Sequence, residues 1–378
     1  MPRTVHQFPK TTAVIETGRL EKLHLGAQLY VSRDGQTLAD AAFGEAQAGA
    51  RMTPDSIPLW LSAGKPIAAV AIARFWESGQ LDLDDAVVRF IPEFAAKGKQ
   101  GVTIRHLLTH TAGIRWVEWS ESWDTTIAQI CDAPLEPRWI PGRTAGYHPF
   151  TTWYILGEII RRLDPGHRSY EKFVAEEIFR PLGMTDCFFA LSAETYRNLG
   201  SRIAPIEVTS QSNARRASFD TESGCAICLP GASGRGPARE LGRFYEMFIA
   251  RGRPLLTPQS VEAISARHRS GIFDITFKHI IDWGLGVIVN SAQYGDSVPY
   301  GFGPHASPRA FGHGGNQSSM ALVDPEYGLV VIVIFNGMSG EEAHQRRMRA
   351  TLGAVYEDMG LGKPEIRNPN DESNPKSE

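Results

Sequence analysis

Both ends of the chain show the apolar runs that are typical of β-strands. Residues 25–44 read LGAQLYVSRDGQTLADAAFG, in which two partly alternating runs flank the turn pair Asp34-Gly35. Strand-like runs return near the other end, in WGLGVIVNS at 283–291 and in SSMALVDPEYGLVVIVIFNG at 318–337. In the last of these, the residues from Asp324 to Gly328 supply a turn. We therefore expect an antiparallel sheet built from both ends of the chain.

The middle of the chain shows a helical pattern instead. From Ser62 to about Arg216, apolar residues recur at spacings of three and four, as in KPIAAVAIARFWESG, ILGEIIRRL and YEKFVAEEIF. The first of these runs ends at Gly79, a common C-terminal signal of a helix. The pattern predicts an α/β (α+β) fold, with an antiparallel sheet flanked by helices and a mainly helical insertion domain between the two halves of the sheet.

The same pattern predicts the domain boundaries. We assign residues 1–75 and 217–362 to a discontinuous α/β sheet domain and residues 76–216 to a helical domain. The final segment, 363–378, reads KPEIRNPNDESNPKSE and has almost no apolar residue, so we expect it to be disordered.

Charge and composition limit the kinds of binding partner that we expect for this protein. The 378 residues include 39 basic and 42 acidic side chains, and no Lys/Arg run marks a surface for nucleic acid or anionic lipid. The N-terminal residues lack the apolar stretch of a secretory signal, and no run is long and apolar enough to span a bilayer. We expect a cytoplasmic protein that acts on a small molecule and binds neither nucleic acid nor membrane.

Several common kinds of site are not expected. The four cysteines, at 131, 187, 225 and 228, include one CxxC pair, but no second pair completes a zinc site. The glycine-rich GASGRG that starts at Gly231 lacks the Gly-Lys-Ser/Thr ending of a P-loop, and we interpret it as an ordinary loop. Neither G-x-S-x-G nor H-E-x-x-H occurs, which argues against an α/β-hydrolase and a zincin. We expect no metal and no cofactor.

One short motif offers a nucleophile. Ser62 and Lys65 lie three residues apart, so on a helix they share a face, and a lysine of lowered pKa can take a serine proton. Two other SxxK matches occur, at Ser169 and at Ser373, but both lie in polar surroundings. Only Lys65 lies in an apolar stretch, LWLSAGKPIAAVAIA, where burying a lysine is costly unless it has a purpose.

The residues around Ser62 resemble a known superfamily. The segments WLSAGKPIAAVAIARFWESGQLDLDDAVVRFIPEF, TIRHLLTHTAGI, IPGRTAGYHPFTTWYILGEIIRRL, IFRPLGMTD, PARELGRF and FGHGGNQSSMALVDPEYGLVVIVIFN follow one another in order. Together they are similar to the serine beta-lactamase-related, penicillin-binding-protein-like superfamily, which includes class C beta-lactamases, family VIII esterases and D-amino acid amidases. The resemblance extends from Leu25 to Asn336.

The resemblance implies the other site residues. The family's second motif, a tyrosine followed two residues later by asparagine, falls on Tyr147-His148-Pro149, so Tyr147 fits and Pro149 departs. The third motif, Lys-Thr-Gly in penicillin-recognising members, falls on His313-Gly314-Gly315, without the lysine. By the family's geometry, the oxyanion would lie between the backbone N–H groups of Ser62 and Asn316. We therefore expect Ser62, Lys65 and Tyr147 to be catalytic, and we expect substrate contacts from His148, His313, Gly314, Gly315 and Asn316.

The resemblance also implies the reaction. We expect a serine hydrolase that forms an acyl-enzyme on Ser62, with Lys65 or Tyr147 as the base. Loss of the asparagine and the lysine argues against an efficient beta-lactamase, so a carboxylesterase for small esters is the leading prediction. A D-amino acid amidase or aminopeptidase, a beta-lactamase, an acyltransferase and a non-catalytic binding protein are the alternatives.

Two further predictions concern the surroundings of this site. Trp116, Trp119 and Trp123 are expected to form an aromatic wall near the cleft. His106 and His110 are expected to be structural, bonding backbone in a turn.

Overall fold

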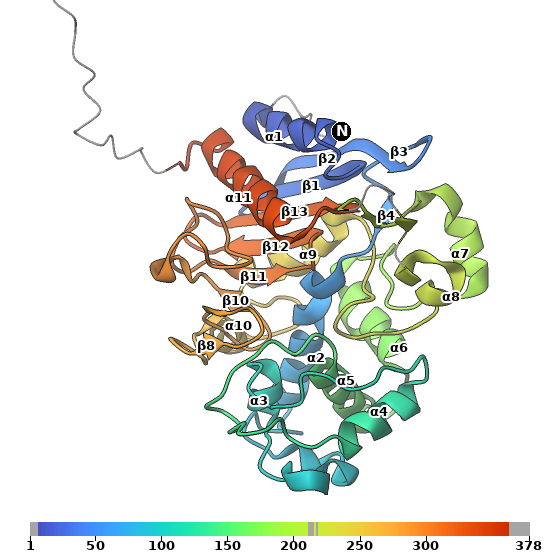
Figure 1. Ribbon diagram of the computed structural model, residues 1–378, viewed down its shortest axis with the longest axis vertical. Helices are drawn as coiled ribbons and strands as arrows, with labels where there is room; N and C mark the ends of the chain where they lie inside the picture. Colours follow the sequence, from blue (N-terminus) through green and yellow to red (C-terminus); the bar gives the residue numbers. More distant parts are fainter. Residues whose placement is uncertain (1–6, 211–214, 217, 363–378) are drawn as a thin grey trace, which may run out of the picture.

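The computed structural model describes residues 7–210, 215–216 and 218–362, and a seven-stranded antiparallel sheet forms its centre (Figure 1). Strands from the C-terminal part of the chain form one half of this sheet, and strands from the N-terminal part form the other half. Across the sheet the strands are β10 (Ile288–Val289), β11 (Phe311–Gly314), β12 (Ser319–Asp324), β13 (Leu329–Phe335), β1 (Gly26–Arg33), β2 (Gln36–Gln47) and β3 (Ala50–Arg51). The predicted sheet from both chain ends is confirmed.

Pairing in the sheet follows the turns that the sequence predicts. In the β1–β2 hairpin Arg33 pairs with Gln36, and the two turn residues between them, Asp34 and Gly35, have φ of +50° and +75°. These values suit a two-residue type I′ turn, which Asp-Gly favours. β12 and β13 are also joined at the predicted turn, where Asp324 pairs with Leu329 across the four residues 325–328.

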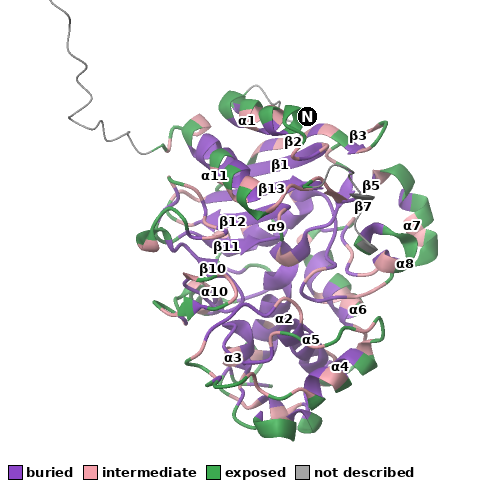
Figure 2. Ribbon diagram, viewed as in Figure 1, coloured by how far each residue is buried: buried purple, intermediate pink, exposed green. Residues whose placement is uncertain are grey.

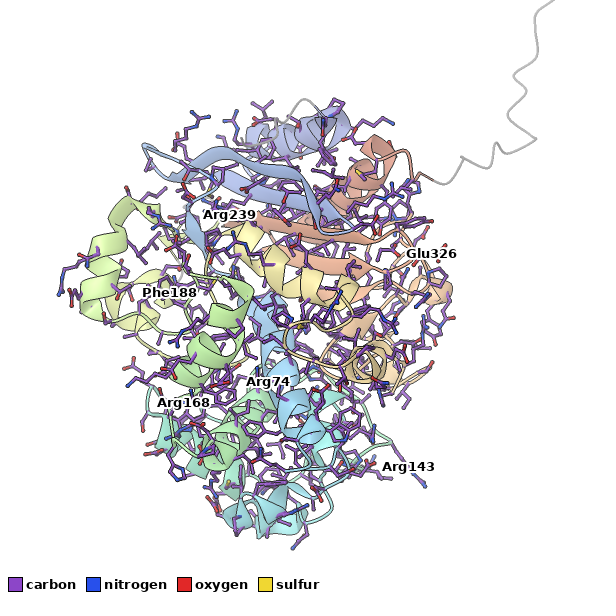
Figure 3. All side chains as sticks on the ribbon, turned by 180° about the vertical axis from the view of Figure 1, so that it is seen from behind. Arg74, Arg143, Arg168, Phe188, Arg239 and Glu326 are labelled. Carbon is purple, nitrogen blue, oxygen red and sulfur yellow. The ribbon has the colours of Figure 1, made fainter. Side chains whose placement is uncertain are left out.

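Helices cover both faces of the sheet. On β1, Leu29 and Val31 belong to the apolar cluster that contains Met348 and Leu352 of α11 (Glu341–Asp358), which packs beside α1 (Pro9–Leu20). The intervening Tyr30 belongs to the other cluster, with α9 (Ala238–Ile249), which lies across the opposite face (Figure 3). This division follows from the alternation of side chains along a strand.

The remaining helices gather beside the sheet around α2 (Lys65–Glu77), whose side chains are buried almost all round (Figure 2). The sequence of such a helix is apolar on every side because no side is exposed to solvent. The helices around it or further out are α3 (Ile104–Leu108), α4 (Trp123–Asp132), α5 (Thr151–Leu163), α6 (Tyr170–Val174), α7 (Ala193–Leu199), α8 (Glu222–Cys225) and α10 (Pro258–Ser265).

Short strands connect the region before residue 217 to the sheet side of the molecule. They are β4 (Ile57–Pro58) with β5 (Ile203–Ala204), and β14 (Gly337–Met338) with β6 (Glu207–Val208) and β7 (Arg215–Arg216). A further pair, β8 (Phe273–Asp274) with β9 (His279–Ile280), precedes β10. The α/β architecture agrees with the prediction, while the domain boundaries stay a prediction, and the segment 363–378 lies outside the described residues.

One predicted strand is much shorter than expected. The run at 283–291 pairs in the sheet only at Ile288 and Val289. Before them the chain turns back on itself, since the Gly284 N–H donates to the Val287 carbonyl at 2.9 Å and Gly286 has a φ of +76°. An apolar run does not distinguish this turn from a continuous strand.

Candidate active site

Ser62 lies on a tight turn at the start of α2. It belongs to a 3-10 turn, Leu61–Gly64, that leads directly into the helix, and Leu61 before it has a φ of +51°. A side-chain-bearing residue in this left-handed region costs about 1–3 kcal/mol and persists only where the surroundings fix it. Here Ser319 on β12 donates from Oγ to the Trp60 carbonyl at 2.6 Å, which ties the turn to the sheet. Ser62 itself is half-buried and lines a cavity.

Lys65 is the first residue of α2 and is fully buried. Its Nζ lies 3.0 Å from Ser62 Oγ, 2.8 Å from the Pro149 carbonyl oxygen and 2.6 Å from the Gly231 carbonyl oxygen. No carboxylate pairs with this amine among the described residues. Burial therefore lowers the pKa of Lys65 well below its ordinary value, which favours the neutral amine.

Tyr147 approaches Ser62 from the segment before α5. Its hydroxyl lies 2.8 Å from Ser62 Oγ, and Lys65 Nζ lies 5.3 Å from the centre of its ring. Burial raises the pKa of Tyr147 above its ordinary value, so the hydroxyl keeps its proton near neutral pH. The three residues predicted to be catalytic are thus brought together around one oxygen atom.

A buried ion pair holds the backbone of Tyr147. Asp274 accepts from the Tyr147 N–H at 3.1 Å and pairs with Arg269 at 3.0 Å, and both side chains are almost completely buried. Thr276 Oγ1 in turn donates to the Tyr147 carbonyl at 3.1 Å. These bonds anchor Tyr147 to the segment that forms part of the cavity wall.

The turn after β11 lies against the Ser62 turn. A Cβ atom on Gly315 would lie 2.4 Å from the Trp60 carbonyl oxygen, so only glycine permits this approach. Within the described chain, neither the Ser62 nor the Asn316 amide N–H is matched with a hydrogen-bond acceptor. Two free donors beside the nucleophile are what a developing oxyanion requires.

Buried contacts from α11 fix the same turn. The Arg347 guanidinium donates to the Gln317 carbonyl at 2.9 Å and to the Gly337 carbonyl at 2.6 Å. Gln317 Oε1 also accepts from the Gly340 N–H at 2.7 Å, immediately before α11. Arg347 of α11 and the preceding Gly340 therefore fix the turn that carries the Asn316 N–H.

His313, which the sequence analysis expects in place of the lysine of penicillin-recognising proteins, is neutral. Its Nδ1 lies 2.8 Å from the carbonyl oxygen of Gly314 and so carries the proton. Burial, and secondarily Lys65, lowers the pKa of His313 to about 3. The site accordingly offers no cation at this position for a substrate carboxylate.

Ser62 and Tyr147 face a largely apolar cavity of about 540 Å³. Its other lining residues are Trp116, Pro149, Thr276, Phe277, Ile288, Pro299, Tyr300, His313, Gly314, Asn316 and Glu341. The predicted substrate contacts at His313, Gly314 and Asn316 are thus at the cavity wall, and Gly315 lies behind it against Trp60.

His148 is placed differently from the prediction. Its ring is fully buried and its Nε2 accepts from the N–H groups of Gly113 and Ile114, both at 3.1 Å. The backbone N–H of His148 donates to His110 Nδ1 at 2.9 Å. These bonds use the side chain to hold a loop, so His148 makes no part of the cavity wall, and the expected substrate contact is corrected to a structural role. The His110 ring thus accepts from a backbone N–H, the kind of contact that the sequence analysis expects of it.

The three tryptophans do not form one wall. Trp116 lines the Ser62 cavity, whereas Trp119 lines a separate apolar cavity of about 480 Å³ with Phe150 and Phe219. Trp123 donates from Nε1 to Glu158 at 2.8 Å and packs against Tyr154 within the helical region. Only Trp116 therefore fits the prediction.

Sequence reasoning missed several residues of the site. The carbonyls of Pro149 and Gly231 hold Lys65, although Pro149 counted only as a departure and Gly231 only as part of a loop. Backbone carbonyls carry no sequence signal. Tyr300 and Glu341 also line the cavity, and neither belongs to one of the three motifs.

No cluster of three or more His, Cys, Asp or Glu side chains in the described ranges is arranged to hold a metal ion. No described helix combines the length and the apolar character needed to cross a bilayer.

The fold, with Ser62, Lys65 and Tyr147 close together, is that of a serine hydrolase. The beta-lactamase family model matches residues 11–355, and the chain belongs to this family. It is similar to esterase EstB of Burkholderia gladioli, with 29% identity over 87% of this chain and 91% of that protein.

Solved structures show the same fold. A penicillin-binding protein homologue from Caulobacter crescentus superimposes with a TM-score of 0.75 at 28% identity, covering 92% of this chain and 97% of its own. A family VIII carboxylesterase superimposes with a TM-score of 0.76 at 23% identity, covering 94% of this chain and 99% of its own.

Proposed function

We propose that this protein is a carboxylesterase that hydrolyses small esters through an acyl-enzyme on Ser62. The observation that carries the proposal is the position of Ser62 Oγ, 3.0 Å from Lys65 Nζ and 2.8 Å from the Tyr147 hydroxyl, at the wall of a largely apolar cavity. The similarity to esterase EstB supports the choice of substrate class.

The hydrogen-bond partners of Lys65 favour this residue as the base. A neutral amine has two N–H groups and one lone pair. The two N–H groups match the carbonyls of Pro149 and Gly231, which leaves the lone pair directed toward the Ser62 hydroxyl. Tyr147, which keeps its proton, then donates to Ser62 Oγ and orients it.

The reaction follows from these roles. Ser62 Oγ bonds to the ester carbonyl carbon while its proton passes to Lys65 Nζ, and the oxyanion is held by the N–H groups of Ser62 and Asn316. The C–O bond to the alcohol then breaks, and the leaving oxygen takes the proton from Lys65. A water molecule repeats the sequence on the acyl-enzyme, with Lys65 again as the base, and releases the acid.

Two features of the cavity support esters over beta-lactams and peptides. Neutral His313 offers no cation for a carboxylate, and Pro149 offers neither a side-chain amide nor a backbone N–H to a substrate amide. Esters also need less help for their leaving group than amides. We further propose that the protein acts in the cytoplasm.

Mass spectrometry of the intact protein tests the proposal directly. Wild type and Ser62→Ala would be mixed with p-nitrophenyl butyrate, a D-amino acid anilide or nitrocefin, and product release would be followed in parallel. We expect a butyryl adduct on Ser62 and rapid turnover of the ester by wild type alone. Faster turnover of the anilide or of nitrocefin would replace the esterase with an amidase or a beta-lactamase, and no adduct with any compound would contradict the hydrolase.

A further inference from the structure

The cavity beside Ser62 carries one acidic side chain and no basic one. Among the described residues that line it, Glu341 is the single Asp or Glu, and neither Lys nor Arg is present. Burial lowers the pKa of Lys65 and holds His313 neutral, so these two groups bring little positive charge. Arg115, which donates to the lining residue Thr276 at 3.0 Å, is paired with Glu136 at 2.6 Å. Glu341 is therefore the one side chain on the described lining that carries a full charge.

Glu341 is exposed to solvent, and two neighbouring side chains fix its carboxylate beside the cavity. The Tyr300 hydroxyl donates to Oε2 at 3.3 Å, and Gln345 Nε2 donates to Oε1 at 2.7 Å. Gln345 is fixed in turn, since its Oε1 accepts from the Tyr300 N–H at 2.9 Å. A carboxylate has about four acceptor positions, so these two bonds leave capacity for a ligand.

Aromatic rings form much of the remaining wall. The ring centre of Phe277 lies 4.9 Å from that of Tyr147 and 5.7 Å from that of Tyr300, so the three rings form a continuous surface. Trp116, with 59% of its surface exposed, adds a fourth ring at the same cavity. Aromatic faces attract cations, most strongly where water is excluded.

We propose that this cavity selects esters that carry a positively charged ammonium group, with Glu341 as the specificity-determining residue. The inference rests on the proposed esterase function and names its substrate class. Aromatic faces would cover the alkyl groups of the ammonium while Glu341 supplies the opposite charge. Esters that carry a carboxylate would be repelled by the same group.

The position of Glu341 in α11 offers an internal control. Glu341 and Glu342 both lie in the first turn of the helix, where either carboxylate stabilises the helix N-terminus. The Glu342 side chain is 96% exposed, pairs with Arg346 at 3.6 Å and does not line the cavity. Glu341→Gln and Glu342→Gln therefore make the same change of charge in the same helix turn, and only the first alters the cavity.

Pairs of esters with equal shape test the proposal. Acetylcholine and 3,3-dimethylbutyl acetate differ only by N⁺ or carbon in the alcohol, and p-nitrophenyl 6-aminohexanoate and heptanoate differ only by NH₃⁺ or methyl in the acyl group. The ratio of kcat/KM for the cationic and the neutral ester would be measured in wild type and both variants. We expect Glu341→Gln to lower this ratio about tenfold in at least one pair, and Glu342→Gln to leave it unchanged.

The outcomes separate this inference from the esterase function. Turnover of the neutral esters with an unaltered ratio in Glu341→Gln, or an equal change in Glu342→Gln, overturns the selection of cations alone. No turnover and no adduct with any of the four esters overturns the esterase function. A readout without turnover is calorimetric binding of butyltrimethylammonium to Ser62→Ala. We expect Glu341→Gln in that background to weaken the binding about tenfold, and unweakened binding would contradict the role of Glu341.

Discussion

Among the residues that the structure describes, two lysines are fully buried, and they lie in two different regions. Lys65 opens the central helix α2, next to the cavity, whereas Lys99 follows the Pro92–Gly98 turn at the far side of the helical region. Burial lowers the pKa of both, and both lie over aromatic rings, at 5.3 Å from Tyr147 and 5.4 Å from Phe94. Burial and a lowered pKa alone therefore do not distinguish a catalytic lysine from a structural one.

The hydrogen-bond acceptors distinguish them. Lys99 Nζ donates to the carbonyls of Ala96 and Cys131, both at 2.8 Å, and to the carbonyl of Ala133. Three carbonyls require three N–H groups, which only the ammonium form has. Lys65 has two carbonyls and one hydroxyl, a set that a neutral amine satisfies completely. The comparison teaches that the count of obligate acceptors, rather than burial, indicates which amine can act as a base.

The largest effect on activity is expected from removing the Lys65 amine, which lies next to Ser62. Lys65→Met should lower kcat/KM for p-nitrophenyl butyrate by about 10³-fold, because general-base assistance of the serine is lost. Lys65→Arg should be equally inactive, since a guanidinium stays protonated and cannot accept the proton. Far-ultraviolet circular dichroism would confirm that both variants fold, and substantial activity in Lys65→Arg would contradict the role as base.

The corresponding change at Lys99 should affect stability and not catalysis. Lys99→Met leaves three carbonyls without their shared donor, so we expect the free energy of unfolding to fall by about 3 kcal/mol. The activity of the folded protein should stay near that of wild type. Urea denaturation of wild type and Lys99→Met would measure the change in the free energy of unfolding.

The adjacent Lys97 is the matched control for that variant. It is 47% exposed and pairs with Asp132 at 2.9 Å, so Lys97→Met should cost less than about 1 kcal/mol. Equal losses at the two lysines would remove the structural role assigned to the buried one.

The pH dependence of kcat/KM in the wild-type protein distinguishes Lys65 from Tyr147 as the base. Because burial lowers the pKa of Lys65, the fraction of neutral amine rises with pH through a midpoint below the ordinary value for lysine. Below that midpoint kcat/KM should fall about tenfold per pH unit, and above it kcat/KM should be level. A tyrosinate base would behave differently, since the pKa of Tyr147 is raised and the rate would still climb beyond pH 10. Tyr147→Phe should retain the acidic limb if Lys65 is the base.

The sequence predicts the sheet well because its signals are local. The turn pair Asp34-Gly35 and the apolar runs on either side of it determine the β1–β2 hairpin without help from distant residues. The run around Gly286 fails for the converse reason. Its turn is held by the Gly286 N–H bond to the Leu108 carbonyl, a contact of the folded state that no local pattern encodes.

The site divides in the same way. The sequence could predict that Ser62, Lys65 and Tyr147 lie together because they stand in an ordered series of motifs. His148 occupies a motif position, but its ring turns to a loop backbone, which depends on how that loop folds. The cost of burying a lysine indicates that the residue has a purpose but does not say which. Lys99 is buried for a structural purpose, the binding of backbone carbonyls, that its sequence surroundings do not reveal.

The smallest expected effect tests whether the placement of Lys65 matters. A Cβ atom on Gly231 would lie 3.0 Å from Lys65 Nζ and 3.0 Å from Trp153 Cγ, so the amine must shift by a few tenths of an ångström to accommodate Gly231→Ala. We expect kcat/KM to fall about three- to tenfold, since proton transfer depends on the distance between Nζ and Ser62 Oγ. Gly101→Ala is the control, because a Cβ atom there meets nothing within 4 Å. An unchanged rate in Gly231→Ala would mean that the pair tolerates displacement, and the count of acceptors around Lys65 would then matter more for its protonation than for its position.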